Sequence, residues 1–227
     1  MSKPRILEVR TQILKANDTI ARSMRDEFRS AGVYVVSLVS SPGAGKTTFL
    51  RATLKTLVEQ GYKVAALVGD LATENDARRL AESGAPTRQI VTGTVCHLEA
   101  DMVRKALDGW NLNELDFLFI ENVGNLVCPS SYDLGEDLRL VLLSTTEGED
   151  KPLKYPTIFN TADIAVITKI DLAEPCDFNR ELCRQNMNEV RPKIEILEVS
   201  SKSGTGMQDW IDYLLARRAA AETTHAV

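Results

Sequence analysis

The sequence predicts an α/β fold in which a mostly parallel sheet is covered by helices on both faces. Nearly continuous apolar runs, such as VYVVSLVS at residues 33–40, are expected of parallel strands that are buried on both sides. Helical patterns alternate with these runs, and such alternation requires crossover connections between parallel strands. A glycine-rich loop, SSPGAGKTT at residues 40–48, directly follows the first run. Together these observations indicate a doubly wound domain.

The elements are predicted in chain order. A helix from residue 5 to about residue 30 is indicated by Ile6, Val9, Ile13, Ile20, Met24 and Phe28, which recur mostly at helical spacing, and Gly32 is expected to end it. About seven strands are predicted within residues 33–40, 62–69, 88–93, 116–123, 138–145, 162–169 and 193–200. Helices are predicted at 49–60, 74–83, 98–107 and 207–218, and a long loop at 145–156. We expect a single domain, 1–227, with the N-terminal helix, 1–32, packed on it.

Composition narrows the class of protein. The 227 residues include 27 Lys and Arg against 32 Asp and Glu, for a net charge of −5. Because there is no block of like charge, we expect no nucleic-acid partner and no membrane partner. No apolar run approaches the roughly 20 residues of a spanning helix, and MSKPRILEVR does not look like a secretory signal. The 4 cysteines are unevenly spaced, so a reducing cytoplasmic location is expected.

The glycine-rich loop matches a phosphate-binding P-loop, because it joins a strand to a helix. Its glycines let the backbone turn its N–H groups toward phosphate oxygens, while Lys46 faces the β- and γ-phosphates and Thr47 faces Mg²⁺. The pattern G-x-x-x-x-G-K-[ST] has Gly where this chain has Ser40, which we expect to lie at the strand exit, away from the phosphates. The predicted nucleotide-binding residues here are Pro42, Gly43, Ala44, Gly45, Lys46, Thr47 and Thr48.

The motif TKID, residues 168–171, predicts that the nucleotide is GTP. The Asp171 carboxylate would accept hydrogen bonds from N1–H and the 2-amino group of guanine, donors that adenine lacks on that edge. The stem of Lys169 would cover the base, and Ser201 and Lys202, in the next loop, would offer a backbone N–H to guanine O6. The usual motif is N-K-x-D, so Thr168 is expected to weaken a supporting contact.

Two acidic residues at strand ends are candidates for the Mg²⁺ shell. Glu121 ends DFLFIE and occupies the place of a Walker B acid, and Asp70 ends AALVGD. Together with Lys46, these two acids are the predicted catalytic residues, and Thr47, Asp70 and Glu121 the predicted Mg²⁺ ligands. Gly124 would let the backbone reach the γ-phosphate. Because no Gln follows Gly124 to position water, we expect slow hydrolysis.

A cysteine and a histidine are adjacent in VTGTVCHLEADM, residues 91–102. Cys96 and His97 precede a predicted helix and are expected near its first turn, where the helix dipole favours a thiolate. Thiolate and imidazole bind Ni²⁺ or Zn²⁺, and Cys128, shortly after Gly124, is a third candidate ligand. From the residues alone, either a metal site or an incidental Cys-His pair is possible.

The chain resembles the HypB family of hydrogenase nickel-incorporation GTPases. The segments SSPGAGKTT, VGD, TGTVCHLEADMV, FIENVGNLVCP and TKIDL occur in that family's order, and the similarity covers nearly the whole chain. It implies a P-loop GTPase fold, a Ni²⁺ or Zn²⁺ site at Cys96, His97 and Cys128, and a homodimer when GTP is bound. It also implies partners, namely other hydrogenase-maturation proteins and the apo-hydrogenase large subunit.

The chain also differs from many HypB proteins. It lacks their N-terminal C-x-x-C-G-C motif and histidine-rich stretch, so we expect neither a high-affinity N-terminal site nor a nickel store. Cys176 and Cys183 are seven residues apart, plausibly on one helical face, and are interpreted as packing residues. The alternatives are an accessory GTPase for urease or a cobalamin-dependent mutase, a P-loop kinase with structural zinc, and a signalling switch without metal.

Overall fold

The structure, a computed structural model, describes residues 5–70 and 75–225. Its centre is a sheet in the order β3-β2-β4-β1-β5-β6-β7, and all neighbouring strands are parallel. The seven strands are β1 Tyr34–Ser40, β2 Val64–Asp70, β3 Thr87–Val91, β4 Phe117–Glu121, β5 Leu138–Ser144, β6 Ile164–Thr168 and β7 Glu195–Glu198. The predicted α/β fold is confirmed.

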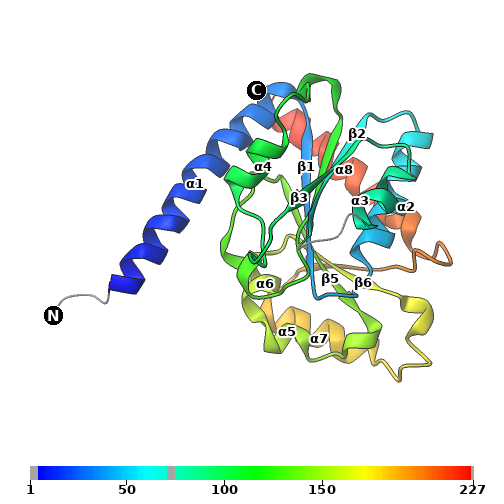
Figure 1. Cartoon of the computed structure of the whole chain (residues 1–227). Coiled ribbons are helices and arrows are strands. Elements are labelled where there is room, and N and C mark those ends of the chain that lie inside the picture. Colours follow the sequence, from blue (N-terminus) through cyan, green and yellow to red (C-terminus); the bar gives the residue numbers. More distant parts are fainter. Residues whose placement is uncertain (1–4, 71–74, 226–227) are drawn as a thin grey trace.

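Helices cover both faces of the sheet (Figure 1). The longer ones are α1 Arg5–Ala31, α2 Lys46–Glu59, α3 Asn75–Ala81, α4 Ala100–Ala106, α7 Arg180–Val190 and α8 Met207–His225. Strand β1 shows the two faces within one element: Val36 packs in the core under α2 and α8, whereas Val35 packs in the core under α1 and α4. Alternate side chains of a strand point to opposite faces, so a strand in the middle of this sheet must be apolar throughout.

The C-terminal half of α1 is packed on the sheet. Met24 and Phe28 are buried, whereas the Ile13 side chain is 46 % exposed, although the periodicity placed all three in one apolar stripe. The N-terminal half extends away from the other elements (Figure 1). No helix in the described part of the chain combines the length and the apolar character that crossing a bilayer would require.

The prediction of a long loop at residues 145–156 is wrong. This stretch contains the 3-10 turn η3 Thr145–Glu147, the short helix α5 Lys151–Lys154 and the start of α6 Pro156–Thr161. Ser144 and Glu147 form a capping box, and Pro152 and Pro156 occupy first-turn positions, which favour proline. Local capping therefore forms helices where the hydrophobic pattern is too short to predict them.

The fold gathers the predicted site residues at one edge of the sheet. The carboxyl ends of parallel strands share an edge, and this edge carries Ser40, Asp70, Glu121 and Thr168 at the ends of β1, β2, β4 and β6. Strand β1 lies in the middle, with β4 on one side and β5 on the other. Ligands of open α/β sheets bind at this edge, close to the point where the strand order reverses.

Candidate functional site

The glycine-rich loop connects β1 to α2 in a conformation that requires its glycines. Gly43 has φ 77° and Gly45 has φ 94°, values that residues with a Cβ rarely adopt. Gly45 is the N-cap of α2, and the helix begins at Lys46. The loop therefore turns the first N–H groups of α2 toward the space beside it, as an anion-binding loop must.

A cavity of ≈ 520 Å³ lies against this loop. Its lining includes most of the predicted nucleotide and Mg²⁺ residues: Pro42, Gly43, Gly45, Lys46, Thr47, Thr48, Asp70, Glu121, Gly124 and Lys169. Ala44, Asp171, Ser201 and Lys202 do not line it. Asp76 and Arg79 also line it and were not predicted; their only signal in the sequence was a position in NDARR, shortly after Asp70.

Lys46 is held at the base of this cavity. Its Nζ donates a hydrogen bond to the Ser40 Oγ at 3.0 Å, and both side chains are buried. Burial lowers the pKa of Lys46, because removal from water disfavours the charged amine. Ser40 ends β1, as predicted, and does not line the cavity, but its hydroxyl holds the lysine of the phosphate loop.

Glu121 and Thr47 form the polar floor of the cavity. The Thr47 Oγ1 donates to Glu121 Oε1 at 2.7 Å, and Glu121 is 2 % exposed. Burial raises the pKa of Glu121 to about 7, although Lys46 and the Thr47 hydroxyl oppose that rise. Within the described residues, Glu121 Oε2 has no hydrogen-bond partner. A buried carboxylate oxygen without a partner, beside a hydroxyl, fits a Mg²⁺ ion, which prefers oxygen ligands.

The segment after β6 is tied to the phosphate loop. The Thr168 hydroxyl donates to the Ala44 carbonyl at 2.6 Å, and Lys169 Nζ donates to the Gly43 carbonyl at 2.8 Å. Thr168 therefore contacts the phosphate loop, although it departs from N-K-x-D. Asp171 is exposed in the turn η4 Ile170–Leu172.

The loop that carries Ser201 and Lys202 lies beside the TKID segment. Ile170 N–H donates to the Val199 carbonyl at 3.2 Å, which joins the end of β7 to the start of η4. Ser201 is half-buried and Lys202 is exposed. The structure therefore brings the predicted base-binding segments together, next to the phosphate loop rather than inside its cavity.

Gly124 is required for close packing of two loops. A Cβ at this position would lie 2.9 Å from both Pro42 Cα and Pro42 N. The segment after β4 thus rests directly on the phosphate loop. Cys128 lies further along the same segment, at the start of the 3-10 turn η2 Cys128–Ser131.

Cys96, His97 and Cys128 form a cluster whose ligand atoms all lie within 4.8 Å of one another. The two Sγ atoms are 2.9 Å apart. Neither ring nitrogen of His97 has a hydrogen-bond partner among the described residues, although Glu99 Oε1 lies 3.4 Å from Nε2. Two thiols and an imidazole with unused buried nitrogens fit a soft divalent cation such as Ni²⁺ or Zn²⁺.

The surroundings of these cysteines differ in one respect from the prediction. Helix α4 begins at Ala100 with Glu99 as its N-cap, so Cys96 and His97 lie in the bend before it, not in its first turn.

The other two cysteines, Cys176 and Cys183, differ in burial. Cys183 is buried in α7, where burial raises the pKa of its thiol to about 12, whereas Cys176 is exposed and precedes that helix. The prediction that Cys176 and Cys183 share one helical face is therefore wrong. Among the described residues, Cys96, His97 and Cys128 are the only group of three or more His, Cys, Asp or Glu side chains whose ligand atoms lie close enough together to hold one metal ion.

Asn122, which was not predicted from the sequence, connects the Cys96, His97 and Cys128 cluster with the cavity at the phosphate loop. It is buried directly after Glu121, it lines the cavity, and its Oδ1 accepts hydrogen bonds from Leu98 N–H at 3.1 Å and Val123 N–H at 2.9 Å. Leu98 follows His97, and its side chain packs on Gly69, where a Cβ would approach to 2.9 Å. The only signal in the sequence was a polar residue at a strand end.

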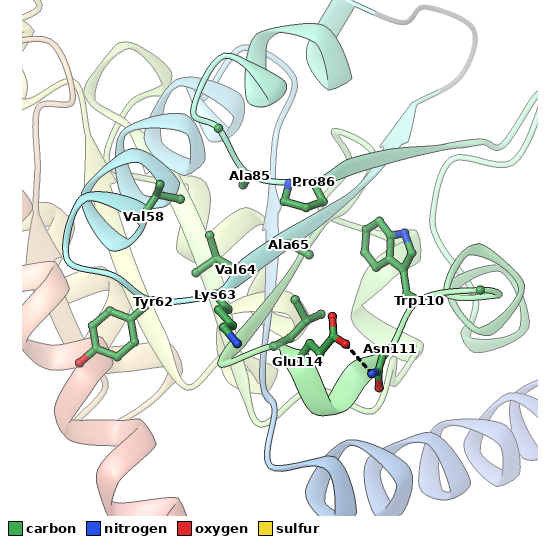
Figure 2. A pocket seen from close by; sticks show the side chains of 13 residues that line it. Val58, Tyr62, Lys63, Val64, Ala65, Ala85, Pro86, Trp110, Asn111 and Glu114 are labelled. Atoms are coloured by element: carbon green, nitrogen blue, oxygen red, sulfur yellow. Dashed lines mark hydrogen bonds between the residues drawn. The ribbon is translucent and has the colours of Figure 1, made fainter.

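A second cavity, of ≈ 560 Å³, lies at the opposite edge of the sheet (Figure 2). It is lined by residues around the amino ends of β2 and β4, including Tyr62, Lys63, Trp110 and Glu114. Glu114 Oε1 accepts a hydrogen bond from Asn111 Nδ2 at 2.8 Å. None of the predicted phosphate or metal residues lines this cavity, so the smaller cavity at the phosphate loop is the functional candidate.

Comparison with known proteins agrees with this geometry. The nucleotide-binding domain of the CobW/HypB/UreG family matches residues 34–198. The chain is 46 % identical over 222 residues to the hydrogenase maturation factor HypB of Rhizobium leguminosarum bv. viciae, covering 96 % of this chain and 74 % of that protein. This chain belongs to the HypB family. HypB proteins are hydrogenase maturation factors. Membership of this nucleotide-binding P-loop family is evidence for nucleotide hydrolysis in general.

HypB of Helicobacter pylori is similar to this chain in both sequence and structure. The hydrogenase/urease maturation factor HypB of Helicobacter pylori is 42 % identical over 221 residues, covering 95 % of this chain and 90 % of that protein. A crystal structure of HypB from Helicobacter pylori in complex with nickel has a TM-score of 0.85 and 42 % identity, covering 90 % of this chain and 96 % of that one. The predicted membership of the HypB family is confirmed.

The raised pKa of Glu121 predicts how the free energy of unfolding depends on pH when nucleotide and Mg²⁺ are absent. This pKa of about 7 in the folded protein exceeds the ordinary value of 4.5, so the folded state holds a proton that the unfolded state releases between these values. Stability therefore falls as pH rises from about 4.5 to about 7 and stays reduced above that, by about 3 kcal/mol. Glu121→Gln should remove this loss.

Urea unfolding of the two proteins, without nucleotide or Mg²⁺, measures the effect. We expect Glu121→Gln to be more stable than the wild type by up to about 3 kcal/mol at pH 8, with little difference near pH 4.5. A stability difference that does not change with pH would mean that Glu121 titrates normally.

Proposed function

We propose that this HypB protein is a GTP-hydrolysing metallochaperone that inserts nickel into apo-hydrogenase during NiFe-hydrogenase maturation. The proposal rests on one observation: Leu98, the residue after His97 of the cluster, donates its N–H to Asn122, and Asn122 follows Glu121, which forms the floor of the phosphate cavity. A site for a soft metal and a site for a nucleotide therefore share one structural element.

The nucleotide site is proposed to bind Mg²⁺ and GTP. Residues 42–48 would hold the phosphates, with Lys46 on the β- and γ-oxygens, and Thr47, Glu121 and Asp70 would hold the Mg²⁺ shell. The guanine would lie over the Lys169 stem, with its edge on Asp171 and on the loop of Ser201 and Lys202. Turnover is expected to be slow, since no Gln follows Gly124 to orient a water molecule.

The cluster is proposed to bind Ni²⁺ or Zn²⁺ as transferable cargo. Three protein ligands leave an open coordination position, whereas structural zinc sites are closed by four. An open position lets an acceptor ligand enter before the protein ligands leave. This arrangement suits a protein that gives its metal away.

The two sites are proposed to be coupled through dimerisation. Gly124 lies against the phosphate loop and Cys128 follows in the same segment, so a γ-phosphate that holds this segment would also place the cysteine. In this proposal GTP favours a homodimer with the metal ligands near the interface. GDP favours monomers and release of metal to apo-hydrogenase, assisted by other maturation proteins.

A second candidate differs only in the client enzyme. The Helicobacter pylori relative is named a hydrogenase/urease maturation factor, so nickel delivery toward urease is the alternative with a specific observation behind it. A P-loop kinase with structural zinc is disfavoured by the similarity to HypB proteins along nearly the whole chain.

The nucleotide assignment predicts a preference for GTP over ATP of at least about a hundredfold, because a carboxylate left without its donors costs a few kcal/mol. Asp171→Asn should shift this preference toward xanthosine nucleotides, and Lys46→Ala should abolish turnover. Asp177→Asn is a matched control: it is also an exposed aspartate after β6, and its φ of 49° suits Asn. Calorimetry measures the affinities of each protein for GTP, ATP and xanthosine nucleotides. Equal affinity of the wild type for ATP and GTP would contradict the assignment.

The metal assignment predicts that Cys96→Ala and Cys128→Ala each lose most Ni²⁺ affinity without unfolding. Affinity should also fall below about pH 6, where protons compete for the ligands. Cys176→Ala, at an exposed cysteine outside the cluster, should bind as the wild type does. The measurement is a Ni²⁺ titration against a competing chelator, with circular dichroism as a check of folding. Wild-type affinity in both cluster variants would refute the ligand assignment.

A further inference from the structure

The metal cluster is assembled from two segments that are distant in sequence. Cys96 and His97 precede α4, whereas Cys128 lies in the loop between β4 and β5. We propose that Asn17, in the N-terminal helix α1, is a positioning residue that holds these two segments in register. The inference rests on the proposed metal site. It adds a residue whose hydrogen bonds go to Ala100 and Asp133 and not to the three metal ligands.

Asn17 makes one hydrogen bond to each segment. Its Oδ1 accepts from Ala100 N–H at 2.8 Å, and its Nδ2 donates to the Asp133 carbonyl at 2.8 Å. Ala100 is three residues after His97, and Asp133 is five residues after Cys128. The Asn17 side chain is buried, with 5 % exposure, so water competes poorly for either bond. A single amide group therefore links the start of α4 with the end of the Cys128 loop.

The helix that carries Asn17 is firmly attached to the Cys128 loop. Arg25, two turns further along α1, makes a 2.6 Å ion pair with Asp133. Gly135 lies so close that a Cβ there would be 2.9 Å from the Ala21 carbonyl oxygen, and Ala21 is itself buried. Because α1 is fixed on this side, the bond from Asn17 to Ala100 sets the position of α4 relative to the Cys128 loop.

A ring contact carries this register to a metal ligand. Tyr132, adjacent to Asp133, packs on His97 with ring centroids 4.1 Å apart and an interplanar angle of 35°. A shift of the Cys128 loop relative to α4 would move Tyr132 across the His97 ring. It would also separate the two Sγ atoms, which come from the same two segments.

An amide suits this position for a specific reason. It offers a donor and an acceptor in one rigid plane, whereas Ala offers neither and an Asp carboxylate offers only acceptors. The Ala100 N–H is the first of α4, so no helix carbonyl can replace Asn17 as its partner. Asn17→Ala therefore removes the partner of one backbone group on each metal-bearing segment, the buried Ala100 N–H and the partly buried Asp133 carbonyl.

The test compares Asn17→Ala with Asn186→Ala in the full chain. Asn186 is a matched control because it is also a buried helical asparagine, 8 % exposed, whose Nδ2 donates to a backbone carbonyl, that of Glu149, at 2.9 Å. It lies in α7, outside the cluster. Both variants should be less stable than the wild type. Only Asn17→Ala should lose Ni²⁺ affinity, by about 10- to 100-fold as for other supporting residues around metal sites, with an altered thiolate-to-nickel absorption band.

The readout is Ni²⁺ competition with a chelator, at a temperature where circular dichroism shows each variant folded. Asn17→Asp, which keeps the acceptor for Ala100 but loses the donor, should show an intermediate loss. Affinity and absorption of Asn17→Ala within twofold of the wild type would overturn the proposal, and so would equal losses in Asn17→Ala and Asn186→Ala. If Asn17→Ala does not fold, Asn17→Asp decides alone, with a loss below twofold counting against the proposal.

This outcome is separable from the fate of the metal site itself. If the Cys96→Ala and Cys128→Ala variants bind Ni²⁺ as the wild type does, the proposed metal site fails, and the role of Asn17 fails with it. If those variants lose binding but Asn17→Ala does not, only the positioning role is refuted.

Discussion

The end of strand β4 is the constraint on which the rest of the site depends. Glu121 faces the phosphate cavity, and the next residue, Asn122, accepts a hydrogen bond from Leu98 N–H beside His97. Two residues later, Gly124 packs on Pro42 of the phosphate loop. Because the sheet is entirely parallel, this strand end lies between the phosphate loop and the segment that carries Cys96 and His97. The proposed nucleotide site and the proposed metal site therefore share these few residues.

Three hydrogen bonds hold the polar groups of the cavity in their observed positions. Lys46 bonds to Ser40, Thr47 bonds to Glu121, and Lys169 bonds to the Gly43 carbonyl. Phosphate and Mg²⁺ would compete for these groups. Burial raises the pKa of Glu121, and a divalent ion at this carboxylate would favour its charged form. Ligand binding in this cavity would replace these contacts, and in our proposal this change reaches the segment that follows β4.

The sequence predicts the sheet and the phosphate loop well, because apolar strands and the glycine spacing are local signals. The Cys96, His97 and Cys128 cluster also follows from resemblance to HypB segments and is close together in the structure. Asn17 and Asn122 were not predictable, since a buried asparagine in a sequence looks like any polar residue until its partners are known. The helices within 145–161 were missed for a related reason: caps and prolines form them rather than a long apolar stripe.

The central claim is that the nucleotide state is transmitted to the metal cluster, and Ni²⁺ affinity in two nucleotide states tests it most directly. Ni²⁺ binding is measured on one preparation, once with Mg²⁺ and GDP and once with Mg²⁺ and a non-hydrolysable GTP analogue. The account predicts tighter binding with the GTP analogue, by a factor of about 5 to 150. Linkage requires Ni²⁺ to raise the affinity for the analogue, relative to GDP, by the same factor. Equal Ni²⁺ affinity in the two nucleotide states would contradict the account.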